Sequence, residues 1–275
     1  MELSGTAEQL QAQPFATLAV QRSGPLLQVT LNRPAQRNAI DSVLLAELHR
    51  VIDQAEADVS CRAVVLAGTG GVFCSGMDFE EAAEGSGSAD FEQQAGAYIR
   101  LLRRLTETPR VMVASVDGLA AGGGVGLAAA CDLVVATPSS TFSLPEALWG
   151  LLPCCVLPYL VRRIGFQPAY RMALTTQAWS AEAAQHCHLV DSVSDRPGEA
   201  IRKLLLRTLR ADADVVGALK QTMRELSAVS AETEQSAVAA LCRLVARPQT
   251  RAAISAYATQ GVFPWANNLG GMANV

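Results

Sequence analysis

The sequence predicts an α/β protein whose sheet is mainly parallel and whose last third is helical. Apolar runs of strand length alternate with segments of helical periodicity up to about residue 153, a pattern typical of a parallel sheet covered by helices. Beyond that point helical periodicity dominates, and only Leu189-Val190 is interpreted as a further short strand. The chain has 275 residues, of which 50% are hydrophobic and 17% charged, so one large core can be buried.

The N-terminal elements begin with a hairpin. Residues 15–20 and 26–31 are predicted strands, and the glycine and proline within 22–25 indicate the turn between them. The motif at 32–34 ends the second strand. Asp41 can then cap a helix whose apolar residues recur at helical spacing.

The alternation continues through the middle of the chain. Residues 1–14 are expected to be a loose lead-in, and the acidic, glycine-rich stretch 80–90 predicts a mobile loop. We expect the helical last third to serve subunit contacts. Strands are predicted over 62–67, 110–116 and 132–136, helices over 91–107 and 125–130, and further helical runs over 158–164, 169–174, 201–209, 215–226 and 236–246.

Composition excludes several classes of function. The formal net charge is −4 and no basic run occurs, so nucleic acid is not an expected partner. No apolar run reaches membrane-spanning length, and the N-terminus lacks a signal pattern. The seven cysteines are an odd number without a CxxC pair and lie mostly in apolar runs. They predict reduced thiols in a cytoplasmic protein.

Lysine and metal chemistry are not expected. Lys203 and Lys220 are the only lysines, and both fall in predicted surface helices, so a Schiff-base mechanism is set aside. His186, Cys187 and His188 lie close together near a helix end. They lack a carboxylate or second cysteine at ligand spacing, so we expect no metal site there.

Two glycine turns carry the strongest functional signal. The first turn, 73–78, follows the apolar run 63–67, and the second turn, 122–124, follows the apolar run 111–116. At such strand-to-helix junctions, backbone N–H groups lack a partner within the helix and point outward. Two of them converging on one acceptor form an oxyanion hole, which stabilises negative charge on a carbonyl oxygen. The turns therefore predict an enzyme that acts on an acyl group.

The three consecutive glycines have two other interpretations. They can form a tight junction without any ligand, because glycine permits close backbone approach and positive φ. Residues 124–129 also fit the GxGxxA pattern of a dinucleotide site. That site needs an acidic residue at the end of the next strand. The strand 132–136 is followed by none, and Glu146 lies beyond a further segment, so this alternative is weak.

Glu146 is the candidate acid/base. Its neighbours are apolar and Pro145 restrains the backbone before it, and a carboxylate in an apolar wall has a raised pKa. A helix-starting glutamate without catalytic duty is an equally good interpretation of the local sequence. We expect Asp117 and Asp132 to be structural and Asp78 to cap a helix.

A set of short motifs follows one another in order along nearly the whole chain. They are Leu31-Asn32-Arg33-Pro34 with Asn38-Ala39, Ala63-Val64-Val65-Leu66 with Phe73-Cys74-Ser75-Gly76-Met77-Asp78, Asp117-Gly118 with Gly122-Gly123-Gly124, Cys131-Asp132, and Pro145-Glu146. In this order and spacing they resemble the enoyl-CoA hydratase/isomerase (crotonase) superfamily.

The resemblance implies a crotonase-like spiral of ββα units over 1–205 and a helical trimerisation region over 206–275, assembled as a homotrimer or hexamer. It implies an acyl-thioester substrate carried on phosphopantetheine or coenzyme A, with no metal or nucleotide cofactor. The N–H groups of Met77 and Gly123 would hold the thioester oxygen, and Glu146 would transfer protons. Substrate-binding positions implied around them are Ser75, Gly76, Asp78, Gly122, Gly124 and Cys154.

One departure from the family pattern limits the activities that the resemblance implies. Hydratases of the family carry a first glutamate two residues after the triple glycine, where this chain has Gly126, and a second one at the position of Glu146. Members with a single glutamate include double-bond isomerases and dehydratases of polyketide β-branching. Segments 142–165 and 174–177 look most like these dehydratases, which convert 3-hydroxy-3-methylglutaryl on an acyl carrier protein to the 3-methylglutaconyl product.

Other activities stay open. A single-glutamate enoyl-CoA isomerase or hydratase, a glutaconyl-thioester decarboxylase and a non-catalytic acyl-carrier binding module all fit the motifs. An acyl carrier protein is usually acidic, so a basic docking surface is expected. Its candidates are Arg100, Arg103, Arg104, Arg110, Arg162 and Arg163.

Overall fold

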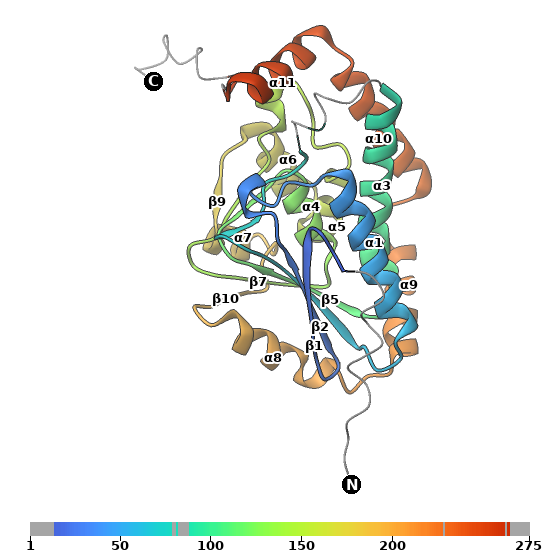
Figure 1. Ribbon diagram of the computed structural model, residues 1–275. Coiled ribbons are helices and arrows are strands. Elements are labelled where there is room, and N and C mark those ends of the chain that lie inside the picture. Colours follow the sequence, from blue (N-terminus) through green and yellow to red (C-terminus); the bar gives the residue numbers. More distant parts are fainter. Residues whose placement is uncertain (1–13, 79–80, 82–87, 228, 262, 265–275) are drawn as a thin grey trace.

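Two sheets rich in parallel pairings form the centre of the molecule (Figure 1). The computed structural model describes residues 14–78, 81, 88–227, 229–261 and 263–264. The six-stranded sheet has the order β1-β2-β3-β5-β7-β10, and the four-stranded sheet has the order β4-β6-β8-β9. Among the strands that the structure describes, β1 pairs antiparallel with β2 and β8 with β9, and the other pairings are parallel. The mainly parallel α/β architecture predicted from the sequence is thus confirmed.

The strands are short and the helices long. The first sheet contains β1 (Leu18–Ser23), β2 (Leu26–Leu31), β3 (Ala63–Gly68), β5 (Val111–Val116), β7 (Leu133–Ala136) and β10 (Ser192–Val193). The second sheet contains β4 (Val72–Cys74), β6 (Leu119–Ala121), β8 (Thr141–Ser143) and β9 (Trp179–Ser180). The helices are η1 (Pro34–Gln36), α1 (Ser42–Ala57), α3 (Ser88–Glu107), α4 (Gly123–Ala130), η2 (Glu146–Trp149), α5 (Leu157–Ile164), α6 (Phe166–Thr175), α7 (Ala181–His186), α8 (Pro197–Thr208), α9 (Ala213–Glu225), α10 (Ala231–Val245) and α11 (Pro248–Gln260).

The chain winds as a spiral, because each turn adds one strand to each sheet. β3 leads into β4, β5 into β6, and β7 into β8, and a helix follows each pair. The bend between β5 and β6 passes very close to the previous turn of the spiral. Gly118 has φ +77° there, and a Cβ on it would lie 1.8 Å from the carbonyl oxygen of Gly71. Only glycine fits this bend, and the expected spiral of ββα units is confirmed.

Both faces of the large sheet are covered, which explains its uninterrupted apolar strands. In β3, Val64 and Leu66 belong to the main core beneath α1 and α3. The alternate residues of the strand, Ala63 and Val65, pack on the other face against Ile201 and other residues of α8. Figure 1 shows α1, α3, α9 and α10 along one side of the sheets and α8 across the lower face.

The structure corrects several element boundaries. The first strand is β1 rather than 15–20, because its pairing with β2 runs from Leu18 opposite Leu31 to Ser23 opposite Leu26. The short strand expected at 189–190 is instead β10, a few residues later. The sequence pattern does not predict the second sheet, because strands of two or three residues are too short to show periodicity.

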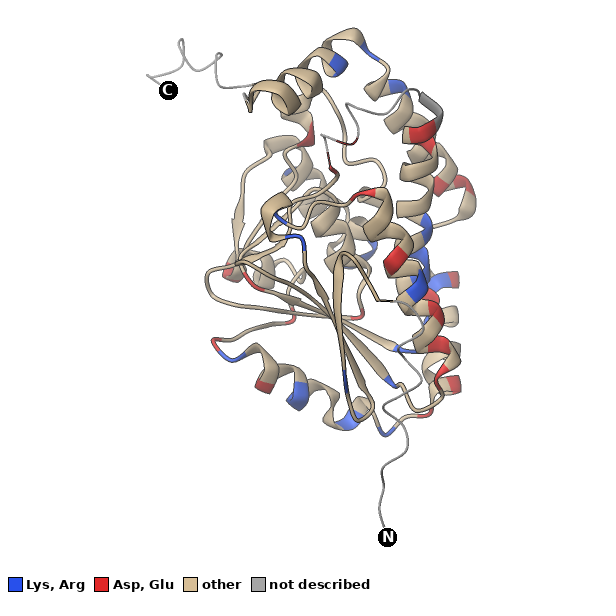
Figure 2. Cartoon of the chain, in the orientation of Figure 1, with Lys and Arg blue, Asp and Glu red and all other residues tan. Residues whose placement is uncertain are grey.

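Some expectations lie outside the described residues. The lead-in is described only at residue 14, and most of the loop expected at 80–90 and the end of the helical region from 265 onward are not described. No helix in the described part of the chain is long and apolar enough to cross a membrane. Figure 2 shows the charged residues mainly on the outer helices and few of them around the sheets.

Lys220 is not on the surface, contrary to the sequence-based expectation. Its amine is buried, forms an ion pair with Asp132 at 2.6 Å, and donates to the carbonyl oxygens of Leu105 and Arg110. Asp132 also accepts the amide of Met112 at 2.7 Å, in keeping with its expected structural role. Burial lowers the pKa of the Lys220 amine, while the charge of Asp132 raises it. This cluster fastens α9 to α3, β5 and the start of β7.

We predict that Lys220→Ala lowers the free energy of unfolding by about 3 kcal/mol, because it leaves a partly buried carboxylate without its cation. The matched control is Lys203→Ala on α8, whose side chain is exposed, and its expected effect is within about 0.5 kcal/mol. Urea unfolding followed by circular dichroism measures both. Equal effects of the two substitutions would contradict the role given to the cluster.

Candidate active site

The two glycine turns and Glu146 line one chamber. Its cavity volume is about 80 Å³, and it lies between the first turn, the start of α4, and η2. Of the site residues expected from the sequence, Ser75, Gly76, Met77, Gly122, Gly123, Glu146 and Cys154 are in its lining. The rest of the described lining is largely apolar and consists of Phe91, Ala95, Tyr98, Pro145, Trp149, Leu151, Leu152, Pro153, Cys155, Val156 and Leu241.

The backbone around Met77 is fixed by a single bridge to Ile40. The amide of Ile40 donates to the carbonyl oxygen of Gly76 at 2.7 Å, and the amide of Asp78 donates to the carbonyl oxygen of Ile40 at 3.0 Å. In this parallel pattern, the N–H of Met77 itself points away from Ile40. Within the described part of the chain it donates to no other group. The Met77 amide therefore remains available to a ligand.

The second turn brings another available amide against the first. Gly123 is the first residue of α4, so its N–H has no acceptor within the helix. Gly76 has φ +100°, and a Cβ on it would lie 3.4 Å from the nitrogen of Gly123 and 3.6 Å from the Cα of Gly122. The two turns are thus in contact. The φ of Gly76 is one that side chains rarely adopt, and a Cβ there would also lie 3.2 Å from the carbonyl oxygen of Ala121, so a side chain at this position would be strained. Such a pair of amides can stabilise an oxyanion.

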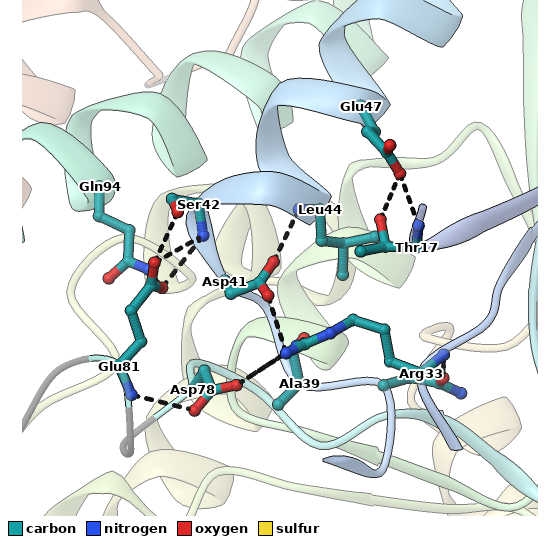
Figure 3. Close-up of polar contacts among 11 residues, drawn as sticks. Thr17, Arg33, Ala39, Asp41, Ser42, Leu44, Glu47, Asp78, Glu81 and Gln94 are labelled. Atoms are coloured by element: carbon teal, nitrogen blue, oxygen red, sulfur yellow. Dashed lines mark hydrogen bonds and ion pairs between the residues drawn. The ribbon is translucent and has the colours of Figure 1, made fainter. Parts of the chain in front are cut away.

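An ion-pair network holds the residue after Met77 (Figure 3). Arg33 lies between Asp41, at 2.7 Å, and Asp78, at 3.2 Å, and it also donates to the carbonyl oxygen of Ala39. The Asp78 carboxylate additionally accepts the amide of Glu81 at 3.3 Å. Asp78 therefore anchors the first turn. It borders an outer groove rather than the inner chamber, and the described lining of this groove consists of Ala35, Gln36, Arg37, Ala39, Ser75, Met77, Asp78, Leu119, Ala121, Ser143, Pro145, Trp149, Tyr257 and Phe263.

Glu146 presents an unsolvated carboxylate to this chamber. It begins η2 directly after Pro145, and its Oε2 atom is buried without a hydrogen-bond partner in the described structure. Burial raises the pKa of Glu146 to about 7, although its own amide opposes the shift. Its Oε1 atom lies against the second turn, since a Cβ on Gly122 would be 3.1 Å from it. A carboxyl group with this pKa can both accept and donate a proton near neutral pH.

Of the expected binding residues, Asp78 and Gly124 do not line the chamber, and Gly124 does not line the groove either. A Cβ on it would be 2.3 Å from the carbonyl oxygen of Cys74, so it permits α4 to pack on β4. Cys154 does line the chamber, and burial raises the pKa of its thiol. Asp117 accepts the hydroxyl of Thr137 at 2.9 Å, as expected for a structural turn residue.

Sequence reasoning missed Tyr98. It lies in the buried face of α3, lines the chamber, and its hydroxyl donates to the carbonyl oxygen of Gly123 at 2.7 Å. The available signal was a tyrosine among the apolar residues of a buried helix face, because a buried tyrosine hydroxyl usually has a partner. The sequence did not indicate which residue that partner would be.

The expected basic docking surface is wrong for two of its members. Arg110 is buried and donates to the carbonyl oxygens of Ala55 and Glu56. Arg163 is largely buried and pairs with Asp191 at 2.6 Å. Arg103 and Arg104 pair with acidic residues of neighbouring helices, Glu234 for Arg103, and Asp53 and Glu56 for Arg104. Of the two other docking candidates, Arg100 is exposed. Arg162 is partly buried, and this burial lowers the pKa of its guanidinium.

Among the residues that the structure describes, no group of three or more His, Cys, Asp or Glu side chains is arranged to hold a metal ion. His186, Cys187 and His188 are included in that result.

The chain is similar in sequence and in fold to known proteins. Residues 21–268 match the family model described as enoyl-CoA hydratase/isomerase. The bacillaene synthase dehydratase PksH of Bacillus subtilis is 33% identical over 91% of this chain and 97% of its own length. The 2,3-dehydroadipyl-CoA hydratase of Escherichia coli is 32% identical over 86% of this chain and 93% of its own length. The crystal structure of pksH from Bacillus subtilis has a TM-score of 0.83 at 32% identity and covers 91% of this chain and 100% of that one.

The pKa of Glu146 predicts a specific pH dependence of stability. Because its folded-state pKa of about 7 lies above the ordinary value of 4.5, the folded protein binds more protons than the unfolded chain between these values. Stability must therefore fall as the pH rises from 4.5 to 7. Relative to Glu146→Gln, the wild type should lose about 3 kcal/mol of unfolding free energy over this interval. Urea unfolding at a series of pH values measures the difference, and parallel curves for the two proteins would contradict it.

Proposed function

Because this chain belongs to the enoyl-CoA hydratase/isomerase family, we propose that it is a lyase that dehydrates a 3-hydroxyacyl thioester carried on an acyl carrier protein. The proposed substrate is 3-hydroxy-3-methylglutaryl-acyl carrier protein, and the product is the 3-methylglutaconyl thioester. The relative PksH, which is a dehydratase of bacillaene synthesis by name, supports a place in polyketide biosynthesis.

The observation that carries the proposal is one unsolvated carboxylate beside two available amides. The amides of Met77 and Gly123 receive the thioester oxygen and stabilise the negative charge that it acquires when the C2 proton leaves. Loss of one such donor typically costs about 3 kcal/mol of transition-state stabilisation. The pKa of Glu146, about 7, suits it to take that proton and return it within one reaction.

Glu146 alone can carry out both proton transfers of the elimination. The carboxylate of Glu146 takes the proton from C2, and the electrons of that bond pass to the enolate. The enolate collapses to the C2–C3 double bond while the bond between C3 and the hydroxyl oxygen breaks. Glu146 gives its proton to the departing hydroxyl, which leaves as water. A second carboxylate is not required, in keeping with the glycine at position 126.

We assign the outer groove to the carrier arm. It shares Ser75, Met77, Pro145 and Trp149 with the chamber, so the two spaces adjoin. The exposed Arg37 is at its edge, where a phosphate of the pantetheine arm would be accommodated. No resident cofactor is needed for the reaction, since the thioester itself acidifies C2.

An aliphatic enoyl-thioester isomerase is the second candidate. The described lining of the chamber includes no Lys, Arg or His, which favours an uncharged acyl chain. Such an enzyme would move a double bond with the same amides and with Glu146 shuttling a proton between two carbons.

In the deciding experiment, the protein is incubated with 3-hydroxy-3-methylglutaryl loaded on a carrier protein, and the mass of the product is measured by mass spectrometry. We predict the loss of one water from the acyl group. Loss of carbon dioxide from a 3-methylglutaconyl thioester would indicate a decarboxylase, and turnover of a 3-enoyl thioester alone would indicate the isomerase. Binding of every thioester without turnover would indicate a binding module, and each of these three outcomes would overturn the dehydratase.

Glu146→Gln should lower the dehydration rate by at least about 100-fold, because the amide cannot accept the C2 proton. The matched control is Glu199→Gln, which changes an exposed glutamate on α8 and should leave the rate unchanged. A Glu146→Gln variant with wild-type turnover would exclude Glu146 as the acid/base.

We also propose that the helical region 206–275 forms the subunit contacts of a homotrimer or hexamer. Val215, Leu219 and Met223 recur at intervals of four on α9, and each side chain is more than half exposed. Such an apolar stripe favours a protein partner. If α9 is a subunit contact, Leu219→Lys should reduce the molar mass measured by light scattering, and an unchanged mass would contradict this assignment.

A further inference from the structure

Tyr98 is a polar group in the chamber to which the proposed reaction gives no task. Tyr98 is 3% exposed, and its hydroxyl donates a hydrogen bond to the carbonyl oxygen of Gly123 at 2.7 Å. Gly123 is the residue whose amide is proposed to hold the thioester oxygen. Burial raises the pKa of the tyrosine well above its ordinary value, so the hydroxyl stays protonated and keeps donating.

The hydroxyl contacts the start of α4 from the chamber side. A Cβ on Gly123 would lie 3.5 Å from both the Cζ and the Oη atoms of Tyr98, which is ordinary van der Waals contact. The hydrogen bond holds the peptide group between Gly123 and Gly124, and the tyrosine ring contacts Gly123 from the same side. The N–H of Gly123 belongs to the preceding peptide group, so Tyr98 acts on it through the position of the Gly123 Cα, at the residue where α4 begins.

The same hydroxyl explains the glycine at position 126. A Cβ on Gly126 would lie 2.0 Å from the Oη atom of Tyr98, a distance that no pair of non-bonded atoms can adopt. Gly126 is inside α4 and its backbone does not have positive φ. A glycine there costs about 1 kcal/mol relative to alanine. The tyrosine, rather than the backbone, requires glycine at this position.

We propose that Tyr98 is a positioning residue that orients the Gly123 amide and, by filling the space above Gly126, restricts the site to one carboxylate. The positioning part rests on the proposed function, because it concerns the amide assigned to the thioester oxygen. The steric part rests on the contact between Tyr98 and Gly126 alone. A carboxylate at position 126 would require the tyrosine hydroxyl to leave first.

The positioning part is tested with Tyr98→Phe, which removes only the hydroxyl. We expect kcat for dehydration to fall about tenfold or more while KM changes less than twofold, because a misplaced donor weakens the transition state. The matched control is Tyr159→Phe. That tyrosine is also buried, but its hydroxyl binds Glu234 at 2.6 Å and it does not line the chamber. It should lower stability and leave kcat unchanged. Equal kcat values for Tyr98→Phe and the wild type would overturn the positioning role.

The steric part needs no substrate. Gly126→Ala should lower Tm by about 5 °C in the wild-type background, because the methyl group collides with the hydroxyl. In the Tyr98→Phe background the nearest atoms to that methyl are the Cγ2 of Val156 at 3.1 Å and the ring carbon at 3.3 Å. In the Tyr98→Phe background, Gly126→Ala should lower Tm by less than about 2 °C. Equal losses in the two backgrounds would overturn the steric role.

The two measurements separate the two claims. If no thioester is turned over but the Tm losses differ between backgrounds, the proposed function fails and the contact of Tyr98 with Gly126 stands. If dehydration occurs but kcat and the Tm losses are the same with and without the hydroxyl, Tyr98 has neither role.

Discussion

The chemistry proposed for this protein depends on the contact between two backbone turns. Gly76 lies in van der Waals contact with Gly122 and Gly123, and its φ of +100° is a backbone conformation that favours glycine. Met77 and Gly123, whose amides have no acceptor in the described structure, both line the chamber, next to the Glu146 carboxylate of raised pKa. Backbone donors are suited to this task because the fold, and not a flexible side chain, sets their direction. Glu146 adds the proton transfer that backbone groups cannot perform.

The spiral explains how turns distant in sequence come to meet. Each winding ends a strand of the large sheet and begins a strand of the small sheet, so β4 and β6 lie side by side. The first glycine turn follows β4 and the second follows β6, which places them at the same edge. The Arg33 network and the bridge to Ile40 hold the first turn, and Tyr98 contacts the second. Support for the site therefore comes from α3 and from the segment before α1, outside the turns themselves.

Local features of the site could be predicted from the sequence, and contacts between distant elements could not. The glycine turns and Glu146 after its proline are recognisable because strand end, glycine and apolar neighbours are adjacent in the chain. Tyr98 and Gly126 lie in two different helices, and no local sequence pattern indicates that they are in contact. Lys220 has the periodicity of a surface helix, yet Asp132 and two carbonyl oxygens hold it in the interior. The strands of the small sheet could not be predicted, because each has only a few residues and is recognised by its pairing with neighbouring strands.

The most direct test of the central claim is a crystal structure of the protein with 3-methylglutaconyl-pantetheine bound. The thioester oxygen should lie about 2.7–3.1 Å from the amide nitrogens of both Met77 and Gly123, with the carboxylate of Glu146 facing C2. An oxygen bound to only one of these amides, or placed outside the chamber, would contradict the shared-acceptor account.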